Sequence, residues 1–91
     1  MEFNLQGKTA IIGGSSKGLG KACAIALARE GVNIVLCARN SDALNQTQKE
    51  IESFGVGVLS LSVDMANIDD NKRIVDEAAN RFGGVDILVN N

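Results

Sequence analysis

Blocks of apolar residues alternate with longer amphipathic segments along the whole 91-residue chain. Four short apolar runs, expected as β-strands, span residues 8–12, 33–38, 57–63 and 85–89. The three segments between them carry apolar residues at helical spacing and are predicted as α-helices over residues 18–30, 42–54 and 68–82. The runs at 33–38 and 85–89 are largely continuous, as in strands buried on both faces, whereas the run at 57–63 alternates with serine, as an edge strand would.

The apolar residues of each predicted helix indicate which side faces the core. They are Leu19, Ala22, Cys23, Ala26 and Leu27 in the first helix, Leu44, Thr47, Ile51 and Phe54 in the second, and Ile68, Val75, Ala78, Ala79 and Phe82 in the third. Each helix is followed by a glycine, Gly31, Gly55 or Gly83, which can adopt the left-handed conformation that ends a helix. Asn67 is a suitable N-cap for the third helix.

Alternation of strands and helices predicts an α/β fold, because connections this long join parallel strands through right-handed crossovers. The expected architecture is a Rossmann-type, doubly wound parallel sheet, βαβαβαβ, with strand order 3-2-1-4 and the third strand at an edge. Residues 1–91 are expected to be the N-terminal part of a single nucleotide-binding domain, because the other half of such a sheet is missing.

Composition narrows the classes of function. The chain is 45% hydrophobic and 22% charged with a formal net charge of -2, which indicates a globular protein and gives no reason to expect nucleic acid as a partner. Two cysteines without metal-ligand spacing, and no histidine, point to a reducing cytosol and to no metal site. No apolar run is long enough for a membrane span, and the N-terminus lacks the pattern of a secretory signal.

The turn after the first strand, residues 13–20, is rich in glycine. A strand, a glycine turn and a helix direct backbone N–H groups and the positive end of the helix dipole at one point, which suits a phosphate. A Walker loop does not fit, because Ser15 stands where its first glycine belongs and Ala22 where a hydroxyl residue belongs. The G-x-G-x-x-G pattern does not fit either, since the spacing is Gly14-x-x-x-Gly18-x-Gly20.

This spacing resembles the T-G-x-x-x-G-x-G motif of the short-chain dehydrogenase/reductase family, with Gly13 in place of the usual threonine. Asp64, after the third strand, resembles the family acid that hydrogen-bonds the adenine amino group, and Asn90-Asn91 resembles the start of the N-N-A-G motif. The resemblance covers all 91 residues and extends to the N-terminal halves of 3-oxoacyl-carrier-protein reductases. Loss of a hydroxyl at Gly13 is expected to reduce local order at the end of the first strand.

The glycine turn, Arg39, Asp64 and Asn90 all fall at the carboxyl ends of predicted parallel strands, the edge where open α/β sheets bind ligands. The expected cofactor-binding residues are Gly14, Ser15, Ser16, Lys17, Gly18, Leu19, Gly20, Arg39, Asp64, Met65 and Asn90, and no catalytic residue is assigned. The alternatives are that the glycines only form turns and that Asp64 only orders the loop before Asn67.

NADP is the expected cofactor rather than NAD. An acid at the end of the second strand would bind the ribose hydroxyls of NAD, but the sequence there is Cys37-Ala38-Arg39. Arg39 offers a guanidinium for the 2'-phosphate, and Lys17 resembles the second basic residue of NADP-preferring members. Either side chain taken alone could instead be a solvated surface charge.

The resemblance implies an oxidoreductase acting on a small-molecule carbonyl or alcohol, cytoplasmic, without nucleic-acid or membrane partners, and a homodimer or homotetramer when full length. The family's Ser-Tyr-Lys catalytic set is not on this chain, which has no tyrosine. The 91 residues alone are therefore expected to be inactive, with the catalytic residues beyond Asn91. A non-catalytic dinucleotide-binding or regulatory module on the same fold remains the alternative.

Overall fold

The computed structural model describes residues 4–14 and 18–89. These residues form four strands and three helices in strict alternation. In chain order they are β1 (Thr9–Gly13), α1 (Gly18–Arg29), β2 (Asn33–Ala38), α2 (Ser41–Glu52), β3 (Val58–Ser62), α3 (Ile68–Phe82) and β4 (Ile87–Val89). The predicted elements are confirmed, and no end is shifted by more than two residues.

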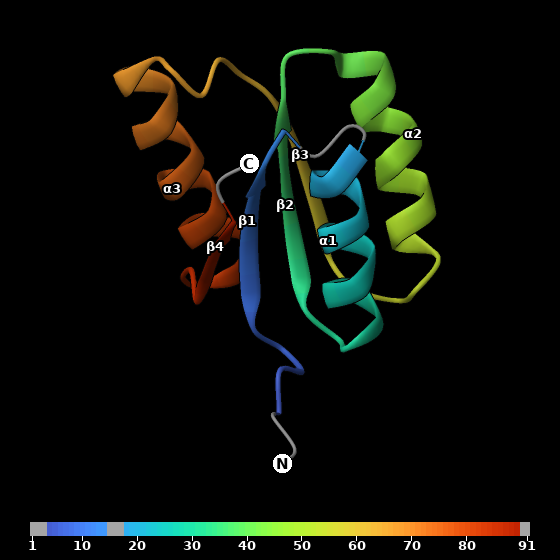
Figure 1. Cartoon of the computed structure of the whole chain (residues 1–91). Helices are drawn as coiled ribbons and strands as arrows, with labels where there is room; N and C mark the ends of the chain where they lie inside the picture. The colour runs from blue at the N-terminus through green and yellow to red at the C-terminus, as the bar shows by residue number, and fades with distance from the viewer. Residues whose placement is uncertain (1–3, 15–17, 90–91) are drawn as a thin grey trace.

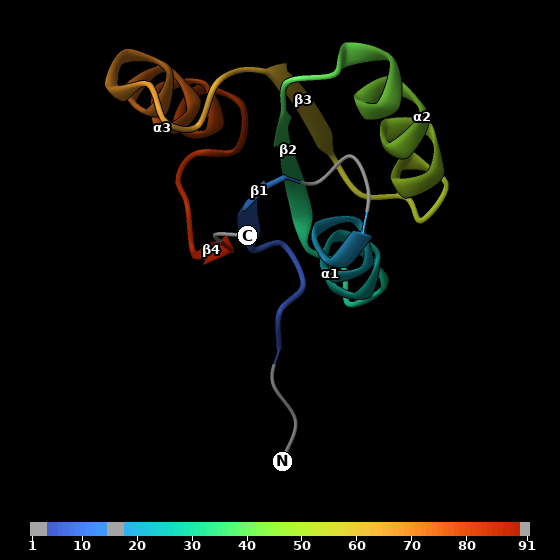
Figure 2. The same ribbon diagram turned by 45° about the horizontal axis from the view of Figure 1, so that its top comes forward.

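The strands form one parallel sheet in the order β3-β2-β1-β4, as the sequence predicts. Helices α1 and α2 cover one face of this sheet and α3 covers the other (Figure 1). Figure 2, viewed from closer to the carboxyl ends of the strands, shows the three layers separately. Because the strands are parallel, the carboxyl ends of β1, β2 and β3 come together at one edge of the sheet.

Alternate residues of the strands pack on opposite faces of the sheet. The residues Ala10, Ile12, Ile34 and Leu36 pack under α1 and α2, while Ile11, Val35, Cys37, Leu61 and Val63 pack under α3 with Ile74 and Ala78. The Asp86 carboxylate accepts a hydrogen bond from the Thr9 N–H at 2.9 Å, and the Asp86 N–H donates to the Thr9 carbonyl at 2.9 Å. This reciprocal pair fixes the start of β4 against β1.

Two of the predicted helix faces are wrong in part, although Leu27 of α1 and Ala78 and Phe82 of α3 pack on the core as predicted. In α1 the buried residues are Gly20, Ala24 and Ala28 instead of the stripe through Leu19, Ala22 and Ala26. This helix is apolar on most sides, so periodicity does not single out a face, and the residues with the smallest side chains allow the closest approach to the sheet. In α3 the buried residues are Ile74 and Ala78, whereas Ile68 and Val75 are exposed.

The helix ends follow the sequence signals closely. The Asn67 side chain accepts a hydrogen bond from the Asp70 N–H and caps α3, as predicted. Asn40 caps α2 in the same way by accepting from the Ala43 N–H, so the helix begins at Ser41. Gly83 ends α3 with a φ of 86°, in the left-handed region that favours glycine. Within the described ranges, no helix combines the length and apolar character needed to cross a membrane.

Candidate functional site

A recess opens at the carboxyl edge of the sheet, between the loops that follow β1, β2 and β3. It has a volume of about 250 Å³. Its lining residues are Gly14, Ala38, Arg39, Val63, Asp64, Met65 and Ala66. Four of the residues predicted from the sequence, Gly14, Arg39, Asp64 and Met65, therefore meet in one place although they are up to 51 positions apart.

The loop after β1 is described at both ends. Gly14 and Gly18 have φ values of 63° and 64°, so both need the conformational freedom of glycine. A Cβ at Gly18 would meet no atom within 4 Å, so its backbone angle, and not crowding, requires glycine there. Gly20 is buried, as expected for close packing of α1, whereas Leu19 is 70% exposed. The predicted site residues Ser15, Ser16, Lys17 and Asn90 lie outside the described residues.

Arg39 follows β2 directly and reaches across to the end of β3. Its carbonyl accepts a hydrogen bond from the Ser62 hydroxyl at 2.9 Å, which ties its backbone to the neighbouring strand. Its guanidinium Nη2 lies 3.1 Å from Oδ1 of Asp64, and the Arg39 side chain is 78% exposed. Backbone position is thus fixed while the charged group remains accessible to a ligand.

Asp64 is held by its own loop as well as by Arg39. Its Oδ1 accepts a hydrogen bond from the Ala66 N–H at 3.0 Å, and its N–H donates to the Asp70 carboxylate at 2.9 Å. The Ala66 N–H, followed by the hydrogen bond and charge of Arg39, holds the pKa of the Asp64 carboxyl below its ordinary value. The side chain is 47% exposed and negatively charged at neutral pH.

Asp64 also orders the loop, which is the alternative role that its position in the sequence allows. Its carbonyl accepts a hydrogen bond from the Asn67 N–H at 3.0 Å, one residue before α3 begins. Both side-chain hydrogen bonds that Asp64 makes with described residues involve Oδ1, so among these residues the structural role leaves the other carboxylate oxygen, Oδ2, available to a ligand.

Gly13 occupies the last position of β1, where it is buried and paired with Cys37. The strand geometry of β1 continues through it. A Cβ at Gly13 would lie 3.1 Å from Cε of Met65 and 3.8 Å from the Val89 carbonyl oxygen. Met65 therefore fills the space that a larger residue at position 13 would take.

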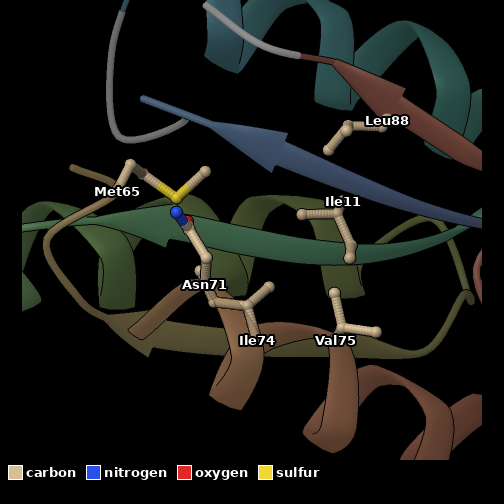
Figure 3. Close-up of a pocket in the computed structure, with 6 residues that line it drawn as sticks. All are labelled: Ile11, Met65, Asn71, Ile74, Val75 and Leu88. Carbon is tan, nitrogen blue, oxygen red and sulfur yellow. The ribbon is translucent and has the colours of Figure 1, made fainter. Parts of the chain in front are cut away.

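A second, apolar pocket of about 270 Å³ lies between α3, β1 and β4. Its lining residues are Ile11, Met65, Asn71, Ile74, Val75 and Leu88 (Figure 3). Met65 lines both this pocket and the recess, so the two adjoin at this residue. Leu88 is 67% exposed although it belongs to a sheet strand.

Sequence reasoning missed the contacts that position the charged residues. The sequence pattern assigns no role to the Ser62 hydroxyl or the Asp70 carboxylate, although one holds Arg39 and the other holds the Asp64 backbone. The spacing Asn67-x-x-Asp70 is that of a capping box, which would direct the Asp70 carboxylate to the Asn67 N–H. In the structure that N–H donates to the Asp64 carbonyl, and Asp70 accepts from the Asp64 N–H instead. Nothing in the sequence signals the contact of Ser62.

A parallel, doubly wound sheet with a glycine loop at the β1–α1 junction defines a Rossmann-type nucleotide-binding fold. The chain matches the family model described as short chain dehydrogenase over residues 8–91. It belongs to this family, whose members are oxidoreductases.

Three comparisons are informative. The chain is 43% identical over 89 residues to 2-dehydro-3-deoxy-D-gluconate 5-dehydrogenase of Dickeya dadantii, covering 98% of this chain and 34% of that protein. The structure is similar to L-sorbose reductase of Gluconobacter frateurii in complex with NADPH and L-sorbose, with a TM-score of 0.94 and 44% identity over 100% of this chain and 35% of that one. It is also similar to NAD+-bound xylitol dehydrogenase, with a TM-score of 0.93 and 30% identity. That match covers 98% of this chain and 34% of that one. The chain thus spans about a third of the length of these relatives.

Proposed function

We infer that the full-length protein is an NADP(H)-dependent oxidoreductase that interconverts a small-molecule carbonyl compound and the corresponding alcohol. One observation carries the choice of cofactor. The residue that follows β2 beside the recess is Arg39, with an accessible guanidinium, and the positions just before it, Cys37 and Ala38, hold no acid. A cation at this position favours a 2'-phosphate, whereas an acid would repel it.

The residues around the recess fit the adenosine half of NADP. Arg39 would bind the 2'-phosphate, and Asp64 would accept a hydrogen bond from the adenine amino group. Gly14 and Gly18, with the N-terminus of α1, would receive the pyrophosphate. NADPH supplies a hydride when bound, and the residues of this chain bind and orient the half of the cofactor that does not react.

The relatives support the class of reaction more strongly than the cofactor. The sorbose reductase was solved with NADPH and the xylitol dehydrogenase with NAD+, so family likeness alone does not choose between them. Arg39 is what favours NADP here. For the substrate, the three named relatives act on sugars, sugar acids or polyols by their names, and give no support to the resemblance to 3-oxoacyl reductases.

We also propose that these residues are the N-terminal part of a longer domain. One observation in support is that the chain covers only about a third of the length of its relatives. The apolar pocket between α3 and β4 is another, because a right-handed crossover from β4 to a further strand would place a helix on the α3 face. That helix would cover Val75 and Leu88, which are 53% and 67% exposed. The catalytic residues and the contacts of a dimer or tetramer would then lie beyond Asn91.

A reducing cytosol suits the two cysteines, which form no disulfide.

Kinetics of the full-length protein test the proposal. Oxidation of NADPH or NADH is followed at 340 nm with a panel of sugars, polyols and ketones. We expect kcat/KM for NADPH to be at least about tenfold above that for NADH, which is the effect of one charge-assisted contact. The sequence beyond Asn91 should contain Tyr-x-x-x-Lys. Binding of NADPH without turnover, together with absence of that motif, would instead establish the non-catalytic module.

A further inference from the structure

The ion pair between Arg39 and Asp64 joins the two residues to which the proposed function gives different parts of the cofactor. Nη2 of Arg39 lies 3.1 Å from Oδ1 of Asp64, across the ends of β2 and β3. Of the described residues that line the recess, Arg39 is the one cation and Asp64 the one anion. The lining that the described residues provide is therefore neutral overall, although it would have to receive a phosphate with about two negative charges.

The Asp64 charge is permanent under working conditions. The hydrogen bond from the Ala66 N–H and the proximity of Arg39 both favour the ionised carboxyl group. Asp70 adds a second carboxylate behind it, because its Oδ2 accepts the Asp64 N–H at 2.9 Å. A 2'-phosphate at Arg39 would thus meet an acid on the next strand end and would compete with it for the same guanidinium.

At this ion pair, the competition of Asp64 with a phosphate for Arg39 outweighs any help that Asp64 gives in positioning the arginine side chain. With Arg39 78% exposed and Asp64 47% exposed, an ion pair restrains the arginine side chain only weakly. The arginine backbone is held independently by the Ser62 hydroxyl, so it does not depend on Asp64 for its place. The like-charge repulsion between Asp64 and a neighbouring phosphate, in contrast, persists wherever the guanidinium turns.

We propose that Asp64 is a specificity-determining residue that opposes the 2'-phosphate by sharing Arg39, and so limits the preference of the protein for NADP over NAD. This inference rests on the proposed function of Arg39. The carboxylate acts on the ratio of the two cofactors, because only one of them carries the additional phosphate. Any hydrogen bond of Asp64 to adenine is common to both and cancels in the ratio.

Titration of the full-length protein with NADPH and NADH, followed by cofactor fluorescence, tests this with Asp64→Asn. Asparagine keeps the shape and the oxygen that accepts the Ala66 N–H, and a thermal melt verifies folding. The ratio of Kd for NADH to Kd for NADPH should rise about three- to tenfold at low salt, as expected for partly solvated charges several Å apart, and the rise should shrink at high salt. An unchanged or lowered ratio would overturn the proposal.

Asp69→Asn is the matched control. It removes the same charge in the first turn of α3 without touching the ion pair with Arg39. The ratio should change by less than about twofold, because a solvated charge that makes no contact with Arg39 is largely screened. An equal rise in both variants would contradict a role for the shared guanidinium. Failure of the proposed function itself would look different: the unmodified protein would show no preference for NADPH at all.

Discussion

Substitution of Gly13 by threonine, the residue usual in the family motif, tests the packing between the end of β1 and the loop after β3. A Cβ at this position would lie 3.1 Å from Cε of Met65, whereas relaxed carbon contacts are about 3.5–4.0 Å. A methyl group alone could be accepted, because the end of a methionine side chain moves easily. Gly13→Ala should therefore change the free energy of unfolding by less than about 1 kcal/mol, helped by the reduced entropy of the unfolded chain.

Threonine adds two further heavy atoms to the same space. Overpacking of this kind costs about 1–3 kcal/mol, and we expect Gly13→Thr to fall in that range. Adding Met65→Ala to the Gly13→Thr variant should recover at least half of the loss, since it removes the atoms that clash. Urea denaturation of the single and double variants gives the coupling energy between the two positions. A Gly13→Thr variant as stable as the original, or a loss that Met65→Ala does not relieve, would refute this packing argument.

Three further outcomes follow from the structure. Burial raises the pKa of the Cys37 thiol to about 12, so Cys37 should react with thiol reagents only on unfolding, while the partly exposed Cys23 reacts in the native protein, as peptide mapping by mass spectrometry would show. The carboxyl of Asp64 has a lowered pKa in the folded state, so the stability it confers is present above the ordinary aspartate pKa and is lost as pH falls through the lowered value. In Arg39→Ala its NMR titration midpoint should rise but stay below the ordinary value, because the backbone hydrogen bond in its own loop remains. Leu88→Asp should destabilise the full-length protein by about 2–4 kcal/mol in urea denaturation if a helix covers the α3 face, and a loss below about 0.5 kcal/mol would argue against that helix.

The strand order was predictable because it depends on properties that a sequence displays directly. Helices between strands require parallel crossovers, and the serine alternation in β3 marks an edge. The face of α1 was not predictable, because a helix with alanines on most sides buries whichever small residues fit the sheet, in this case Gly20, Ala24 and Ala28. The exposure of Val75 in α3 escaped prediction for a related reason: periodicity marks an apolar residue but does not say what covers it.

In the candidate site, too, some features could be predicted from the sequence and others could not. Arg39 and Asp64 could be assigned to the same edge of the sheet, because both follow parallel strands. Their ion pair could not be predicted, since it depends on side-chain conformations and on the hydrogen bond that Ser62 makes to the Arg39 carbonyl. The exchange of volume between Gly13 and Met65 was also hidden, because the two residues are 52 positions apart.

The proposed cofactor preference depends most on Arg39 as the ligand of a 2'-phosphate. The most direct measurement is the dissociation constants of NADPH and NADH for the full-length protein and its Arg39→Ala variant. Arg81→Ala serves as control, because Arg81 lies in the last turn of α3, about 20 Å along the helix from its start. Arg39→Ala should weaken NADPH by roughly 1.5–3 kcal/mol, or about ten- to a hundredfold, and leave NADH and the control nearly unchanged. An equal loss for both cofactors, or no loss for either, would contradict the assignment of Arg39 to the 2'-phosphate.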